Sequence, residues 1–147
     1  MEDYNAAFLR CAKDVEALHE QRRCIAAMHF GGVAIECFLK YILVSSIPEN
    51  ATMEWYKNAT KTPNYGHVYR NPGHNYGEAW MQHSELQTRV ASNPSVQEWL
   101  AAVEEPDGCH FIDMRYSSKE PEAEKYDEWR ETYRSLVKWL QEQSMIL

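Results

Sequence analysis

Glu36 and Lys40 stand four residues apart inside the most apolar segment of the chain, residues 26–43. This spacing predicts an ion pair on one face of a helix. A carboxylate in an apolar run must find a partner or stay protonated, because burying an unpaired charge is costly. The same run holds Gly31 and Gly32, and a glycine inside a helix costs about 1 kcal/mol against alanine. We expect a half-buried polar site here and a helix that approaches closely at the glycines.

Arg115 is a second residue that could do chemistry, with Tyr116 directly after it. A guanidinium group binds phosphate through two parallel N–H groups. Three glutamates lie within the next nine residues and would repel a phosphate. Two interpretations therefore stay open: Arg115 binds a phosphate, or it is the structural partner of an anion, Glu36 in particular.

A third region combines cations with aromatic side chains, because no acidic residue occurs between Glu54 and Glu78. Its cations and histidines are Lys57, Lys61, His67, Arg70 and His74, and five aromatic residues are interleaved with them. Such a pattern is typical of a groove that follows a nucleic-acid backbone and stacks its bases. The alternative is a loop whose tyrosines dock on the rest of the fold.

Metal and cofactor chemistry is not indicated. The four cysteines have no CxxC spacing, so we interpret them as structural thiols. Cys109 and His110 could be combined with His67 and His74 into a metal site, but their spacing does not support one. The sequence has no phosphate-binding glycine loop and no nucleotide fingerprint. We therefore expect no metal and no cofactor.

The bulk composition limits the class of protein. A length of 147 residues predicts one domain, residues 1–147, and the net charge of −7 argues against general coating of nucleic acid. The N-terminus does not resemble a signal peptide. The apolar segment 24–47 is interrupted by His29, Glu36 and Lys40, which favours a buried helix over a membrane span. We expect a cytoplasmic protein.

Apolar residues recur at helical spacing through most of the chain. The predicted helices cover about residues 3–20, 21–45, 75–92, 93–105 and 121–144. Residues 48–74 form a long basic and aromatic loop between the second and third helices. The face of the third helix is formed by Tyr76, Trp80, His83, Leu86 and Val90. The fold class is therefore all-α, an up-and-down bundle of four long helices plus one short helix.

Three of these features together resemble the HEPN family. The second helix carries Ala27 and the run Gly31 to Lys40, similar to the family pattern A-x-x-x-A-G-x-A-x-E-x-x-L-K. His74 stands at the start of the third helix, and Arg115-Tyr116 forms an R-Y element before the last helix. The three landmarks occur in family order and span about residues 22–140.

The resemblance implies a helical bundle that pairs as a homodimer. Family members include ribonucleases of toxin–antitoxin and defence systems, and non-catalytic partners of nucleotidyltransferases. In the ribonucleases four to six residues separate an arginine from a histidine that follows it. Arg115 matches that arginine, but residues 120–122 are Glu120, Pro121 and Glu122.

The leading hypothesis is therefore a HEPN-like protein that binds RNA, a nucleotide or a partner, such as a nucleotidyltransferase-type or antitoxin protein, without cleaving RNA. Its predicted ligand-binding residues are Arg115, Tyr116, Glu36, Lys40, Lys57, Lys61, Arg70 and His74. One alternative is a divergent metal-independent ribonuclease that uses Arg115 with His110 or His74. A second is a helical interaction module with no ligand site.

Overall fold

The computed structural model describes residues 3–47 and 69–147. The α-helices are α1 (Tyr4–Glu20), α2 (Cys24–Ser45), α3 (Tyr76–Trp80), α4 (Ser84–Ala91), α5 (Pro94–Glu104) and α6 (Ala123–Ser144). Two short 3-10 turns, η1 (Pro106–Gly108) and η2 (Asp113–Tyr116), precede α6. Within these two ranges no residue belongs to a β-strand, and the all-α prediction is confirmed.

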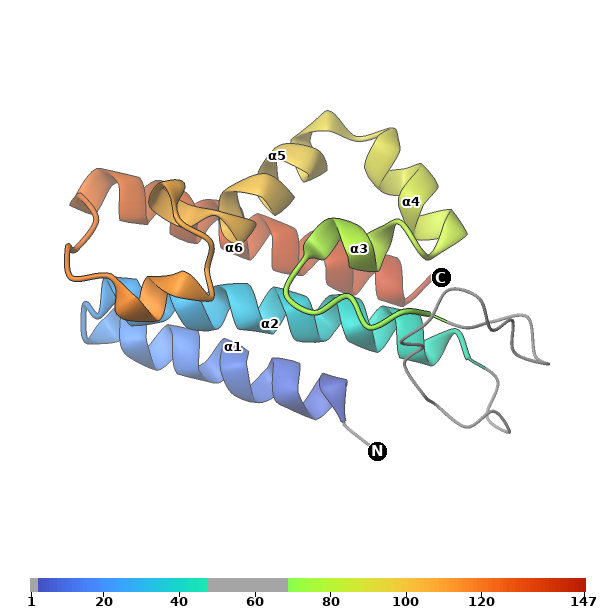
Figure 1. Ribbon diagram of the computed structural model, residues 1–147, viewed down its shortest axis with the longest axis horizontal. Helices are drawn as coiled ribbons and strands as arrows, with labels where there is room; N and C mark the ends of the chain where they lie inside the picture. The colour runs from blue at the N-terminus through green and yellow to red at the C-terminus, as the bar shows by residue number, and fades with distance from the viewer. Residues whose placement is uncertain (1–2, 48–68) are drawn as a thin grey trace.

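Helix α2 lies at the centre of the fold, with α1 antiparallel to it on one side and α6 on the other (Figure 1). The helices α3, α4 and α5 carry the chain back, so that α6 runs in the same direction as α2. Predicted loop residues Lys57 and Lys61 lie outside the described residues. The ends of α1, α2, α5 and α6 agree with the sequence prediction within about three residues.

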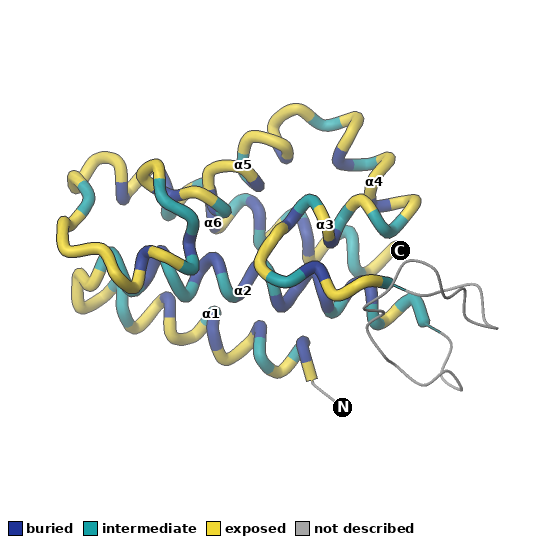
Figure 2. The backbone as a smooth tube through the Cα atoms, viewed as in Figure 1, coloured by how far each residue is buried: buried dark blue, intermediate teal, exposed yellow. Residues whose placement is uncertain are grey.

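Burial is greatest along α2, as Figure 2 shows by its dark segments. Its buried side chains include Met28, Ile35, Leu39 and Leu43, each at most 1% exposed. Among the described helices, α2 is the one long and apolar enough to cross a membrane by length and composition, and 67% of that apolar window is buried inside the fold. In this fold α2 is thus packed as a core helix.

The two glycines of α2 are positions of close approach, as their pattern predicts. A Cβ atom on Gly31 would lie 2.6 Å from the Trp129 ring of α6. One on Gly32 would lie 2.4 Å from Cβ of Phe111, which belongs to the segment between η1 and η2. The neighbour at Gly31 is a helix, as expected, whereas the neighbour at Gly32 is an irregular segment.

The predicted third helix is wrong in one respect, because the chain breaks at residues 81–83 and forms α3 and α4 instead. His83 caps α4, where its Nδ1 accepts a hydrogen bond from the Leu86 N–H at 3.2 Å. The Gln82 amide bonds the backbone N–H and C=O of Arg70 at 2.7 and 3.0 Å. Such side-chain bonds compete with a continuous helix. The described part of the chain therefore has three long helices, α1, α2 and α6.

Replacing Gly32 by alanine tests this packing. In an open helix the change would stabilise by up to about 1 kcal/mol. Here the added methyl meets Cβ of Phe111, which cannot move without its backbone. We expect Gly32→Ala to lower the free energy of unfolding by about 1–3 kcal/mol in urea denaturation. Unchanged or increased stability would contradict the close approach.

Candidate functional site

Glu36 lies at the centre of a polar cluster on α2, and its side chain is 11% exposed. Its Oε2 is 3.7 Å from Nζ of Lys40, so the predicted ion pair is present. Its Oε1 accepts a hydrogen bond from Nδ1 of His74, which precedes α3. Lys40 is buried, with only 8% of its surface exposed. Its buried ammonium group depends on Glu36 for a counter-charge.

The His74 imidazole is oriented by this contact. An ionised carboxylate only accepts hydrogen bonds, so Nδ1 of His74 carries the proton that it donates to Glu36. In the neutral ring, Nε2 then keeps its lone pair. The side chain is 56% exposed, and Nε2 has no bonding partner within the described ranges. A histidine held in this way can accept a proton at Nε2.

His110 has a different environment, because both of its ring nitrogens are occupied. Nδ1 accepts a hydrogen bond from the Ile112 N–H at 3.2 Å, so Nε2 carries the proton. Nε2 donates to the backbone carbonyl of His74 at 3.0 Å and lies 3.9 Å from a carboxylate oxygen of Glu104. His110 thus fixes the backbone that presents His74. These contacts favour a structural role over the catalytic one considered for it.

Phe111 packs against the rings of His74, Tyr76 and His110. Its ring is stacked 4.5 Å from that of His110 and 5.4 Å from that of Tyr76, and it meets the His74 ring edge-on at 6.3 Å. Tyr76 is buried, and its hydroxyl donates to the Gly32 carbonyl at 2.7 Å. Burial raises the pKa of Tyr76 well above its usual value, so this hydroxyl stays a neutral donor.

Arg115 and Tyr116 lie on η2 and are both exposed. The Arg115 guanidinium carbon is 4.7 Å from the centre of the Tyr116 ring, and Tyr116 is 73% exposed. No residue in the described ranges forms an ion pair with Arg115. The expected pairing of Arg115 with Glu36 is therefore wrong: Glu36 is paired with Lys40 and His74.

The described end of the predicted basic and aromatic loop is docked on the fold. Tyr69 shares a hydrogen bond of 2.7 Å between its hydroxyl and Oγ of Ser46 at the end of α2. Arg70 pairs with Glu78 at 3.0 Å. These contacts favour the docking alternative for residues 69–76. They leave Arg70 less available to a ligand than Arg115.

Two residues of the cluster, Glu104 and Phe111, were not predicted from the sequence. Glu104 accepts a hydrogen bond from the Tyr76 N–H at 2.9 Å, and its own backbone carbonyl accepts one from the Phe111 N–H at 2.9 Å. Both residues come from the region before η2, more than 60 residues from Glu36 in the chain. Their types and local spacing give no indication of this contact.

Neither a metal nor a reactive thiol is indicated. No group of three or more metal-ligating side chains occurs among the residues that the structure describes. The four cysteines are free thiols. Burial raises the pKa of Cys37 to about 11, and burial also raises the pKa of Cys11 and Cys24. These three thiols are therefore protonated near neutral pH and poorly nucleophilic.

Comparison of the chain with protein-family models, with curated proteins and with solved structures found no match.

Glu36→Gln tests the electrostatic centre of the cluster. The change removes the counter-charge of the buried Lys40, and breaking a buried pair in this way costs about 3–5 kcal/mol. We expect urea denaturation at pH 7 to show a loss of about 3 kcal/mol. The exposed pair of Arg70 and Glu78 provides the control, because Glu78→Gln should cost less than about 1 kcal/mol.

Removing the lysine charge as well should restore part of this loss. In the double variant Glu36→Gln with Lys40→Met, no uncompensated ammonium group stays buried. We expect the double variant to be more stable than Glu36→Gln alone. Additive losses, or equal effects of Glu36→Gln and Glu78→Gln, would show that Glu36 is not the required counter-charge.

Proposed function

We propose that this chain is a HEPN-like protein that binds single-stranded RNA and does not cleave it. A single nucleotide is the smallest ligand that it binds. The observation that carries the proposal is the exposed pair of Arg115 and Tyr116. An arginine with no ion-pair partner in the described ranges supplies a cation for a phosphate, and an exposed ring supplies a surface for a base.

The resemblance to HEPN proteins supports this reading, since Arg115 and Tyr116 are the matching R-Y element. The absence of a histidine at residues 120–122 supports binding without cleavage. The same proposal includes a homodimer of up-and-down bundles and a cytoplasmic location. It also includes a nucleotidyltransferase-type or antitoxin partner and a role in a toxin–antitoxin or defence system. They rest on the resemblance and on the sequence pattern.

Fluorescence anisotropy with a labelled single-stranded RNA of about 12 nucleotides tests the proposal. We expect Arg115→Ala to weaken binding about tenfold, because a charge-assisted phosphate contact is lost. The slope of log Kd against log salt should fall by about 0.7 to 1. Tyr116→Ala should weaken binding at least fivefold through lost stacking, whereas Tyr116→Phe should retain most of the affinity.

Arg10→Ala provides the matched control. Arg10 is an exposed arginine of α1 with no ion-pair partner in the described ranges, so its removal changes the net charge equally. If Arg10→Ala and Arg115→Ala weaken RNA binding equally, the loss of affinity reflects overall charge and not a phosphate contact of Arg115. No binding of RNA or nucleotide even at low salt would reject the proposal and favour a helical interaction module.

The pair of Glu36 and His74 favours a second candidate, a divergent ribonuclease in which His74 is the general base. RNA carries its own nucleophile, so a protein nucleophile is not required. Nε2 of His74 would take the proton of a 2′-hydroxyl, and the 2′-oxygen would attack the adjacent phosphorus. The bond to the 5′-oxygen would break, and that oxygen would take a proton from water, while His74 would release its proton to the solvent. Arg115 would stabilise the charged phosphate.

Cleavage assays with excess EDTA separate the two candidates. The binding proposal predicts that RNA stays intact. The ribonuclease predicts a 2′,3′-cyclic phosphate product, at least a hundredfold loss of rate in His74→Ala, and no cut where the nucleotide lacks its 2′-hydroxyl. Cleavage that is equal in His74→Ala would exclude His74 as the base.

A further inference from the structure

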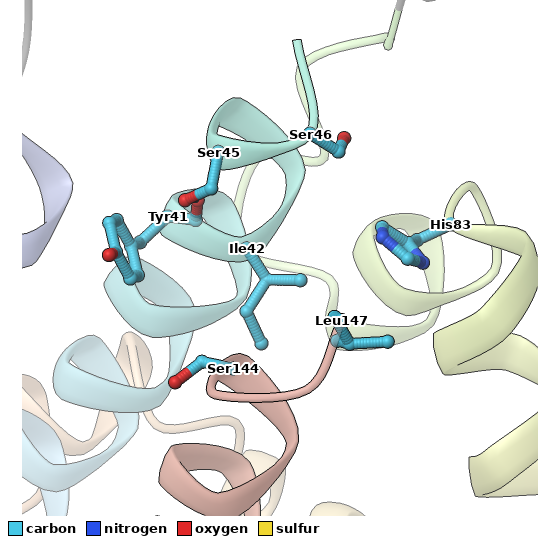
Figure 3. Close-up of a pocket in the computed structure, with 7 residues that line it drawn as sticks. All are labelled: Tyr41, Ile42, Ser45, Ser46, His83, Ser144 and Leu147. Carbon is cyan, nitrogen blue, oxygen red and sulfur yellow. The ribbon is translucent and has the colours of Figure 1, made fainter.

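A small cavity lies where the carboxyl-terminal ends of α2 and α6 meet the turn before α4 (Figure 3). Its volume is about 80 Å³, which is room for several water molecules. The end of α2 supplies Tyr41, Ile42 and Ser45, and Ser46 follows directly after the helix. Ser144 and Leu147 come from the end of α6 and beyond, and His83 forms the remaining wall. None of these residues belongs to the cluster around Glu36.

The three serines that line the cavity have already used their hydroxyl hydrogens. Ser45 donates to the Tyr41 carbonyl at 2.6 Å, and Ser46 donates to the Leu43 carbonyl at 2.7 Å. Ser144 donates to the Gln141 carbonyl at 2.9 Å. A hydroxyl group has one hydrogen and two lone pairs, so each serine oxygen can offer a ligand only a lone pair. A ligand group that bonds these three oxygens must therefore be a hydrogen-bond donor, whereas Nε2 of His83 keeps a hydrogen that it can itself donate.

The helices around the cavity favour a positive charge on that donor. The carboxyl-terminal end of a helix carries a partial negative charge, and both α2 and α6 are 22 residues long. Neither helix has a basic residue in its last turn to offset this charge. The lining residues that the structure describes include no lysine or arginine, and Nδ1 of His83 already accepts a hydrogen bond from the Leu86 N–H.

The remaining lining residues fit a short apolar stem beside the charge. Figure 3 shows the hydroxyl groups of Ser45 and Ser144 on the same side as the Tyr41 ring, with the Ile42 side chain between the two helices and Leu147 beyond it. An aromatic face attracts cations. Ile42 and Leu147 provide apolar surface for methylene groups.

We propose that this cavity binds a primary ammonium group on a short alkyl stem, either as a free alkylamine or as a lysine side chain. The ammonium group donates to Ser45 and Ser144 beside the Tyr41 ring, and its stem lies against Ile42 and Leu147. This site is separate from the RNA-binding proposal, and it can exist whether or not the chain binds RNA.

NMR titration of the ¹⁵N-labelled full chain with n-propylammonium chloride tests the site. We expect saturating shifts of the Ser45, Ser144 and His83 amide signals with an affinity in the roughly millimolar range, because so few ligand atoms bind. Sodium propionate and 1-propanol share the stem but lack the ammonium group, and should leave these signals unshifted. Sodium chloride at the same ionic strength controls for salt.

The double variant Ser45→Ala with Ser144→Ala should weaken propylammonium binding about tenfold, since two acceptors for a charged donor are lost. Ser92→Ala provides the matched control, because Ser92 makes the same kind of bond to the Arg89 carbonyl at the end of α4. Unsaturated shifts, an equal response to 1-propanol, or unchanged affinity in the double variant would overturn the proposal.

Nα-acetyl-lysine methylamide identifies the source of the ammonium group. Saturating shifts of the same amide signals show that a lysine side chain enters the cavity. Saturation by propylammonium alone restricts the site to free amines. Failure of both probes to shift the signals overturns the site.

Discussion

The missing side chains of Gly31 and Gly32 are the constraint on which the rest of the structure depends. They let Trp129 and Phe111 pack against the backbone of the central helix at distances that a methyl group would block. Phe111 in turn supports the rings of His74, His110 and Tyr76. The propensity cost of two glycines in α2 is therefore offset by tertiary packing, which places a polar cluster beside the core.

Charge explains why that cluster has a single arrangement. Lys40 is almost fully buried and needs an anion, and Glu36 is the residue of α2 that supplies it. The second oxygen of the same carboxylate orients His74, whose backbone is held by His110. The Glu36 carboxylate thus links the core helix to the segment before α3. Arg115 stays outside this network and forms no ion pair within the described ranges.

The sequence predicted the features that depend on local spacing. These are the helices α1, α2, α5 and α6, the ion pair of Glu36 and Lys40, and the close approach at the glycines. It did not predict the break between α3 and α4. His83 fits the helical spacing of an apolar face, so the sequence gives no sign that it caps α4 instead. The sequence left open whether Arg115 binds a phosphate or pairs with Glu36, and the second of these interpretations is wrong. The true partner, His74, lies 38 residues away in the chain, a distance over which spacing gives no information.

We propose that the exposed face of η2, which carries Arg115 and Tyr116, binds a nucleic acid. The most direct measurement is the set of backbone amide signals that a short single-stranded RNA shifts in the ¹⁵N-labelled protein. We expect the largest shifts at Arg115 and Tyr116. Shifts confined to other surfaces, such as the exposed faces of α4 and α5, would contradict it, as would the absence of saturable shifts.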